Sequence, residues 1–383
     1  MKIIIDGSDA VVGVRAIRRY TINLIRELIS GYPDDRFTVF LTYFRGDSQV
    51  MDELVGSGKN VSRVRYALPR RLSLPLWELL GVPRVDWFTG AADVFHALGD
   101  DGPPVKGAVY ILTLHGLIYM THPELIDPVY ARKKRSWLQR MSGRVDYFIA
   151  VSEHTKIEFL SCFPEIDPRR VRVIPLGIGS EFRVLERRTV QEKLKAEFQI
   201  NRPYILYVGG LETHKNIQGI LRGFSFVAQR YPDLDLVLVG DPGRGYAEIQ
   251  ALASEGRLRD RVKVIGYVGQ ETDRLPLLYN GAECFVFPSF SEGWTSPPLE
   301  AMACGTPVLT SNVSSLPETV GDAAVAVDPS CPEAIGDAMD RLLTDSTLRA
   351  DLQRKGLQHS GRFTWKRCAE STHALYRDAV AAH

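Results

Sequence analysis

Short apolar runs alternate with longer amphipathic stretches along most of the chain. The run Lys2–Asp6 has the length and the β-branched content of a buried strand. The stretch after it repeats apolar residues at the spacing of one helix face: Ile17, Tyr20, Leu24, Ile25 and Leu28. Further strand-length runs follow at Phe37–Tyr43, Val61–Tyr66, Asp93–Ala97, Val109–Leu114, Tyr147–Val151 and Val171–Pro175. Helical patterns lie between several of these runs, notably Val129–Arg140 and Glu153–Phe163. The alternation predicts an α/β fold with a doubly wound, mostly parallel sheet.

The same alternation restarts after a polar stretch, Gly177–Arg188, and predicts a second doubly wound domain. Its strands are expected at Tyr204–Val208, Leu234–Val239, Val262–Gly266, Cys284–Pro288, Thr306–Thr310 and Ala323–Val327. Its helices are expected to begin near Asn216, Gly245, Thr272 and Pro297. We expect residues 1–181 and 364–383 to form the first domain, with the last helix packing back on it, and residues 182–363 to form the second. Ligands of open α/β sheets bind at the carboxyl ends of the strands, so the site is expected in a cleft between the two domains.

The segment SEGWTSPPLEAMACGTPVLTSN, Ser291–Asn312, combines the chemistry of an anion site with two acids. It predicts a loop after a buried strand, then a helix with Pro297 and Pro298 in its first turn and a stop at Gly305. Backbone amides at a helix N-terminus favour an anion. Glu292 and Glu300 lie on either side of that turn, where carboxylates could bind hydroxyl groups. Backbone amides that could bind a phosphate, next to carboxylates that could bind hydroxyl groups, indicate a sugar nucleotide as the ligand.

This segment resembles the E-x7-E signature of retaining family-4 glycosyltransferases of the GT-B fold. YILYVGGLETHKN resembles the first strand and phosphate loop of that family's donor domain, and VKVIGYVGQETDRLPLLYNGAECFVFPS resembles its base-binding segment. VIPLGIGSEF resembles the connection between the domains, and SSLPETVGDAAVAVDP the part after the signature. The likeness extends over residues 174–328, with a weaker match before them, and is greatest for mannosyltransferase-like enzymes that build bacterial surface polysaccharides.

The resemblance implies a nucleotide-sugar donor, best GDP-mannose, and no metal or other cofactor. It implies that the first domain takes a glycan or lipid-linked oligosaccharide acceptor, and that Glu300 binds the ribose. Glu292, and His115 at the end of the strand in ILTLHG, would hold the transferred sugar, while Lys215 would neutralise the leaving diphosphate. The remaining implied donor contacts are Gly13, Gly209, Gly210, His214, Gly266, Tyr267, Val268, Gly293, Trp294, Thr295 and Ser296.

Four segments depart from the family pattern. The arginine that commonly precedes the phosphate lysine is missing, and whether His214 replaces it stays open. The family's His-Asp reads His-Gly here, with Gly116 after His115. The glycines of the first loop are replaced, so either Gly13, Arg15 or Arg18 contacts the phosphate. Thr295 and Ser296 stand where the family has glycine and a small residue, and together with Trp294 they narrow the predicted sugar pocket.

Composition excludes several classes of function. A net charge of +1 gives no electrostatic basis for nucleic-acid binding. Five scattered cysteines without a C-x-x-C pair disfavour a disulfide framework or a zinc cluster and fit a cytoplasmic protein. No run approaches the length of a membrane span. Basic tracts with apolar residues, Ala131–Arg144 and Arg65–Leu80, suggest peripheral contact with the inner membrane face, against the alternative of a solvated helix face.

Two weaker motifs are set aside. Asp233-Leu-Asp235 matches the D-x-D pattern of another glycosyltransferase fold, but it begins a strand, where we expect solvated carboxylates and no metal. GDPGRGY, Gly240–Tyr246, lacks the Lys-Ser/Thr of a Walker A loop and is expected to be a strand–helix loop near the ligand.

Other functions stay open at this stage. A UDP- or other nucleotide-activated sugar is an alternative donor. A sugar phosphorylase, an epimerase of the same architecture or a non-catalytic sugar-nucleotide-binding relative would share the fold. A nicotinamide-dependent dehydrogenase is disfavoured because DGSDAVVG lacks G-x-G-x-x-G after the first strand.

Overall fold

The computed structural model covers residues 1–383 and describes all of them except 13–14, 43–57, 68–74, 78–79, 100–101 and 270–272. The expectations for Gly13, for Tyr43, for a helix start at Thr272 and for part of the Arg65–Leu80 tract lie outside the described residues. The chain divides into two compact units. The first comprises residues 1–123, 127–177 and 364–383, and the second residues 124–126 and 178–363. The sequence predicted the domain boundary after residue 181, whereas the structure has it after Gly177, four residues earlier.

The first unit is built on a seven-stranded parallel sheet with the order β3-β2-β1-β4-β5-β6-β7. Its strands are β1 (Lys2–Asp6), β2 (Arg36–Leu41), β3 (Val61–Arg65), β4 (Val94–Ala97), β5 (Val109–Leu114), β6 (Tyr147–Ala150) and β7 (Val171–Val173). All six residues of β5 are buried. A strand covered on both faces reads as a continuous apolar run, which is why VYILTL was recognisable in the sequence.

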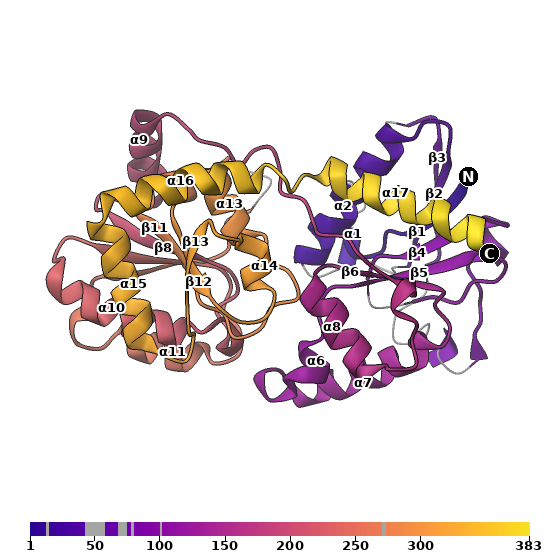
Figure 1. Ribbon diagram of the computed structural model, residues 1–383, viewed down its shortest axis with the longest axis horizontal. Helices are drawn as coiled ribbons and strands as arrows, with labels where there is room; N and C mark the ends of the chain where they lie inside the picture. The colour runs from indigo at the N-terminus through magenta and orange to yellow at the C-terminus, as the bar shows by residue number, and fades with distance from the viewer. Residues whose placement is uncertain (13–14, 43–57, 68–74, 78–79, 100–101, 270–272) are drawn as a thin grey trace. The chain divides into compact units, whose positions relative to one another are not determined.

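Helices cover this sheet. They are α1 (Asp9–Val12), α2 (Arg15–Gly31), α5 (Asp86–Thr89), α6 (Ile118–Thr121), α7 (Pro128–Ser142), α8 (Glu153–Cys162) and α17 (Trp365–Ala382), with 3₁₀ turns at Pro123–Leu125 and Pro168–Arg170. The C-terminal helix α17, yellow in Figure 1, packs against α2 and inserts Trp365 and Tyr376 into the core of this unit. The predicted return of the last helix to the first domain is confirmed.

The second unit contains a six-stranded parallel sheet with the order β10-β9-β8-β11-β12-β13. Its strands are β8 (Tyr204–Val208), β9 (Asp235–Val239), β10 (Val262–Ile265), β11 (Cys284–Phe287), β12 (Val308–Ser311) and β13 (Ala324–Val327). Its helices are α9 (Arg187–Phe198), α10 (Ile217–Arg230), α11 (Tyr246–Ala253), α12 (Arg274–Gly281), α13 (Pro297–Ala303), α14 (Leu316–Val320), α15 (Pro332–Thr344) and α16 (Ser346–Ser360), with 3₁₀ turns at Thr213–Lys215 and Gly256–Leu258.

Both sheets therefore confirm the predicted α/β class with two doubly wound, Rossmann-like domains. In the second sheet the order reverses between β8 and β11, since the chain first runs outward through β9 and β10 and then returns to the other side of β8. Such a switch point leaves room for a ligand outside the carboxyl ends of the central strands. The loops after β8, β11 and β12 thus meet at one edge of the sheet, and most of the predicted site residues lie on them.

Candidate functional site

The loop after β8 is shaped by glycines that let two backbones approach. Gly209 and Gly240 have φ of 157° and 151°, and a Cβ added to Gly240 would lie 1.8 Å from the carbonyl oxygen of Gly209. Beyond them, Leu211 pairs with Pro242 in a parallel bridge. The GDPGRGY segment therefore supports the predicted phosphate loop directly, and its first glycine is required by that contact.

Lys215 ends a 3₁₀ turn, Thr213–Lys215, and forms an ion pair with Glu292 from the loop after β11. Its Nζ donates to both carboxylate oxygens, at 2.6 Å to Oε1 and 2.8 Å to Oε2, and lies 5.5 Å from the ring centre of Phe287. The Lys215 side chain is 18% exposed and that of Glu292 only 8%. Glu292 Oε1 also accepts from Ser289 Oγ at 2.7 Å. The two residues that the sequence assigned to diphosphate and sugar are thus direct partners in a largely buried pair.

His214, beside Lys215, is poorly suited to act as a cation. Burial, and then the nearby charge of Lys215, lower the pKa of His214 to about 4, against a smaller opposing effect of Glu292. Its Nδ1 lies 3.3 Å from Glu212 Oε2. At neutral pH the imidazole is uncharged, so His214 does not supply the positive charge of the arginine that the sequence lacks.

Glu300 lies on α13 and is completely buried. Its Oε2 accepts a hydrogen bond of 2.9 Å from the hydroxyl of Tyr279, a buried residue of α12. Glu300 is therefore no solvated helix residue. A buried carboxylate requires hydrogen-bonding partners, and this side chain is held by the fold at a set position near the first turn of α13.

His115 lies in the first unit, directly after β5. Its Nε2 is 2.7 Å from the carbonyl oxygen of Leu98, so Nε2 carries the proton and donates it. The ring of Tyr20 meets it edge-on with 5.0 Å between ring centres. Gly116 has φ of 141°, a conformation that strains any residue with a side chain. The glycine at this position suits this backbone conformation.

The family follows from comparison of this chain with known proteins. Residues 190–359 match the family model described as "Glycosyl transferases group 1", and residues 17–182 match "Glycosyltransferase Family 4". The chain belongs to the family-4 glycosyltransferases of the GT-B fold. It is 28% identical to the O-antigen chain mannosyltransferase B of Escherichia coli, over 98% of this chain and 100% of that protein.

Two further similarities agree with this assignment. The glycosyltransferase is 29% identical to the serotype-specific mannosyltransferase WbdA of Escherichia coli. The aligned region covers 74% of this chain and 35% of WbdA. Its fold superimposes on sucrose-phosphate synthase from Thermosynechococcus elongatus with a TM-score of 0.74 and 20% identity, covering 100% of each chain. The predicted mannosyltransferase-like membership and the GT-B fold are confirmed.

The other predicted donor residues of the glycosyltransferase fall into two groups. Gly266, Tyr267 and Val268 follow β10, where Tyr267 is 47% exposed and Val268 is buried. Gly293 to Ser296 lie between Glu292 and α13, and Thr295 is buried. Trp294 packs its ring 5.3 Å from that of Phe363, and its buried Nε1 has no hydrogen-bond partner in the part of the chain that the structure describes. Trp294 is therefore anchored to the body of the unit.

The structure describes the predicted phosphate contacts of the first loop in part. Gly13 lies outside the described residues, and Arg15 begins α2. Arg18 is half-buried on α2, and its buried Nε has no hydrogen-bond partner among the described residues.

One expectation about a rejected motif was wrong. Asp235 is 1% exposed at the start of β9, whereas a solvated carboxylate was expected there. Three cations surround it, with Lys263 Nζ at 3.3 Å, Arg261 Nε at 3.4 Å and Arg202 Nη1 at 3.8 Å. The reason is that this end of β9 is covered by side chains from β10 and from the residues before β8. Asp235 therefore forms a buried ion-pair cluster at the amino end of the sheet.

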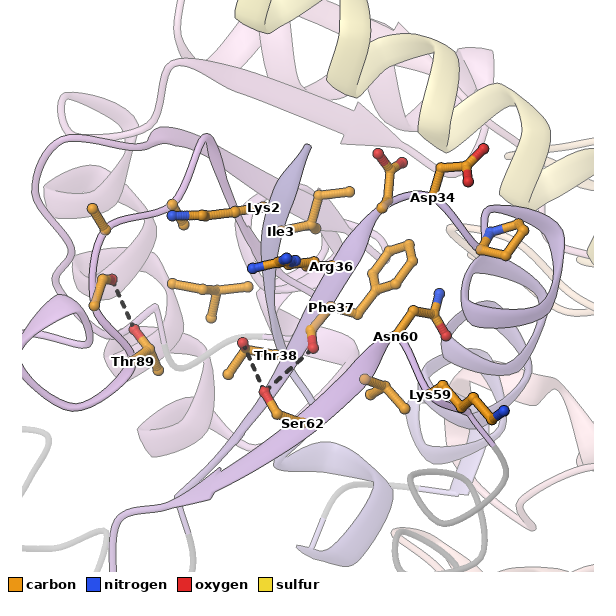
Figure 2. Close-up of a pocket in the computed structure, with 17 residues that line it drawn as sticks. Lys2, Ile3, Asp34, Arg36, Phe37, Thr38, Lys59, Asn60, Ser62 and Thr89 are labelled. Atoms are coloured by element: carbon orange, nitrogen blue, oxygen red, sulfur yellow. Dashed lines mark hydrogen bonds between the residues drawn. The ribbon is translucent and has the colours of Figure 1, made fainter.

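A cavity of about 640 Å³ lies elsewhere in the glycosyltransferase and is no donor site. Figure 2 shows its lining, with Lys2 and Arg36 as the first residues of β1 and β2 and Ser62 as the second residue of β3. The hydroxyl of Ser62 lies 3.1 Å from that of Thr38 across these strands. Because ligands of doubly wound sheets bind at the carboxyl ends of the strands, a cavity at the amino ends does not lie where a nucleotide sugar is expected.

Sequence reasoning missed several residues that hold this site. Tyr279 binds Glu300, Ser289 binds Glu292, and Ser311 Oγ donates to the carbonyl of Ser289 at 2.6 Å. Ser314 also contacts Glu292. Lone serines and a tyrosine carry no recognisable spacing, so nothing in the chain pointed to them. Asn216 was detectable in part, because asparagine before an apolar helical stretch is a common N-cap.

Proposed function

We propose that this glycosyltransferase moves mannose from GDP-mannose, with retention of configuration, onto an oligosaccharide or lipid-linked glycan in the synthesis of a bacterial surface polysaccharide. The observation that carries the proposal is the Lys215–Glu292 pair at the carboxyl edge of the second sheet. It provides a cation for a diphosphate and a carboxylate for sugar hydroxyls within one cluster. The full-length similarity to an O-antigen mannosyltransferase supports the choice of mannose.

The proposed chemistry separates charge, and the cluster can stabilise both parts. Breaking the bond between the sugar C1 and the phosphate oxygen leaves an oxocarbenium-like sugar and a diphosphate with additional negative charge. Lys215 and the backbone amides near Gly209 and Gly210 would stabilise the diphosphate. The new bond from the acceptor oxygen forms on the same face of C1, and the leaving phosphate oxygen takes the acceptor's proton.

The remaining predicted residues would bind and orient the donor. Glu300 would accept hydrogen bonds from the ribose hydroxyls, and the backbone of Gly266 to Val268 would contact the base. Glu292 and His115 would bind the sugar hydroxyls. In the structure, the Nε2–H of His115 donates to the carbonyl oxygen of Leu98. The proposal involves no metal, since Lys215 would supply the positive charge that neutralises the diphosphate. Turnover that is unchanged by EDTA would support this part, and loss of turnover restored by Mg²⁺ would contradict it.

A thermal-shift panel of GDP-, UDP-, ADP- and dTDP-sugars tests the donor. A ligand that binds the folded state raises the melting temperature by mass action, so GDP-mannose should give the largest shift. A larger shift with a UDP-sugar would replace GDP-mannose in the proposal. Transfer to a mannose-containing acceptor, followed by NMR of the anomeric proton, then tests retention. A chain that binds a donor and neither transfers nor hydrolyses it would be a non-catalytic binding relative.

We further propose that the first unit associates peripherally with the anionic inner face of the membrane. None of the helices in the described part of the chain is long and apolar enough to cross a membrane. The start of α7 exposes Val129 (60%) and Tyr130 (47%), and the exposed cations Arg132, Lys133 and Arg135 follow them. Apolar side chains beside cations suit an interface with acidic lipids, at about 1 kcal/mol per well-placed cation.

Vesicle flotation tests this association. The wild type should float with vesicles containing phosphatidylglycerol and stay in solution with neutral ones. A Val129→Ser, Tyr130→Ser double variant should lose flotation while keeping its melting temperature. A wild type that stays in solution with both kinds of vesicle would refute the proposal.

A further inference from the structure

Among the described residues, three that are not glycine adopt a positive φ: Gln199 (55°), Asn216 (59°) and Ser314 (59°). This left-handed conformation is unfavourable for side chains, so it persists only where surrounding contacts enforce it. Two of the three are connected to the Lys215–Glu292 pair, because Ser314 forms hydrogen bonds with Glu292 and Asn216 directly follows Lys215 in the chain. Gln199 ends α9 and has no contact with that pair in the interactions of the described residues.

Ser314 holds the backbone of Glu292 at two points. Its Oγ accepts a hydrogen bond from the N–H of Glu292 at 2.9 Å and donates one to the carbonyl oxygen of the same residue at 2.7 Å. Ser314 follows β12, the neighbour of β11 in the sheet, so the clamp joins the loops after two adjacent strands. A single hydroxyl thereby satisfies both backbone groups of the residue whose carboxylate faces Lys215.

Asn216 plays the corresponding part for Lys215, which it follows directly in the chain. It is 5% exposed, and its Nδ2 donates to the carbonyl oxygens of Pro288 at 3.0 Å and Pro329 at 2.6 Å. Its Oδ1 accepts from the N–H of Gly219 in the first turn of α10 at 3.2 Å. The turn carrying Lys215 is thus tied to the loop after β11, on which Glu292 lies five residues beyond the end of the strand.

We propose that Ser314 and Asn216 are positioning residues of the transfer site, Ser314 for Glu292 and Asn216 for Lys215. The inference rests on the proposed function, because it assigns the two substrate-binding roles to Glu292 and Lys215. Ser314 and Asn216 act only through these two residues. Their strained backbone is maintained by hydrogen bonds that each side chain makes to the neighbouring loops.

Glycine substitutions test the inference, because glycine accepts a positive φ while removing the side-chain hydrogen bonds. Ser314→Gly should lower donor turnover roughly 10- to 100-fold, as small misplacements of reacting groups do, and leave GDP affinity by calorimetry nearly unchanged. Asn216→Gly should lower turnover in the same range. Gln199→Gly is the matched control, with the same backbone conformation in the same unit, and should leave turnover unchanged. GDP-mannose serves as donor, or whichever sugar of the thermal-shift panel the wild type turns over.

Double-mutant cycles decide whether the effect passes through the pair. In a Glu292→Ala background, Ser314→Gly should cause little further loss of turnover, because its target is already absent. In a Lys215→Ala background the same should hold for Asn216→Gly. Full additivity in these cycles, equal loss in Gln199→Gly, or wild-type turnover in Ser314→Gly would each overturn the inference. A wild type that binds no nucleotide would refute the proposed function itself, and the inference with it.

Discussion

Lys215 Nζ lies 2.6 Å and 2.8 Å from the two carboxylate oxygens of Glu292, a residue 77 positions later in the chain. Neither partner is fully exposed, so their attraction is weakly screened by water and salt. Removing one partner of such a pair leaves the other charge buried without compensation. Each of the two residues therefore supports the position of the other, in addition to any contact with substrate.

Substitution of Lys215 by alanine should lower donor turnover by about 10²–10³-fold, since a preorganised cation for the leaving diphosphate is lost. The melting temperature should fall as well, because Glu292 stays buried without its partner. Steady-state kinetics and thermal denaturation measure the two effects. The exposed Lys193 on α9 provides the control: Lys193→Ala should change neither. Near-normal turnover of Lys215→Ala would contradict its role.

Substitution of Glu300 by glutamine should weaken GDP binding at least roughly tenfold, because a neutral amide replaces a carboxylate that accepts from the ribose hydroxyls. Isothermal titration calorimetry measures the dissociation constant. Tyr279→Phe separates this from a structural role, since it removes the hydroxyl that donates to Glu300 and keeps the carboxylate. A Glu300→Gln protein with lower stability and unchanged GDP affinity would show that the residue serves only the fold.

Acidification should destabilise the glycosyltransferase through the buried residue His96 of β4. Burial, and then the charge of His115, lower the pKa of His96 to about 3 from an ordinary value of 6.5. Between these pH values the unfolded chain binds a proton that the folded chain does not. Stability is therefore complete above pH 6.5 and falls by about 1.4 kcal/mol per pH unit below it, or about 2 kcal/mol at pH 5.

Urea denaturation at pH 7.5 and pH 5.0 measures this contribution. His96 accepts or donates hydrogen bonds with Tyr376 at 2.6 Å and with Thr113 at 2.8 Å, so His96→Asn keeps a polar side chain there without a titrating group. The variant should be less stable at pH 7.5 but should lose less on acidification. His214, whose pKa is also lowered, adds a change of the same sign in both proteins. An equal loss in variant and wild type would rule out His96 as the source.

Substitution of Gly240 by alanine should destabilise the second unit by about 2–4 kcal/mol, because the new Cβ would meet the carbonyl of Gly209 at 1.8 Å and force a backbone shift. The same shift should weaken GDP binding, since Gly209 belongs to the predicted phosphate loop. Gly256→Ala is the control: Gly256 also has a positive φ, of 46°, but nothing lies within 4 Å of an added Cβ. Equal loss of stability in the two variants would contradict the role of the close approach.

Local patterns were sufficient to predict the elements and to single out the charged residues of the proposed site. Apolar runs such as VYILTL and CFVFP identify buried strands because strands covered on both faces exclude polar residues. The helix at Pro297 was recognisable from prolines at its start and glycine after its end, which are local backbone requirements. Lys215, Glu292 and Glu300 could be singled out because each lies shortly after or within a predictable βα unit.

These local patterns did not predict contacts between segments that are distant in the sequence. The sequence assigned Lys215 and Glu292 to different groups of the donor, and only the pairing of β8 with β11 makes them partners. The burial of Asp235 among three cations and the neutral state of His214 depend on which side chains cover them. Hydroxyl groups that hold the site, on Ser314 and Tyr279, have no spacing signal because their partners are 22 and 21 residues away.

The sequence by itself determined the two doubly wound domains and the family, and it singled out the charged residues of the proposed site, because periodicity and short motifs are properties of neighbouring residues. The tertiary structure decided which of these residues touch, which are charged and what holds them. Hydrogen bonds, desolvation and close backbone approach depend on distances in space, and here those distances are set by strand order and by loops that only the folded sheet brings to one edge.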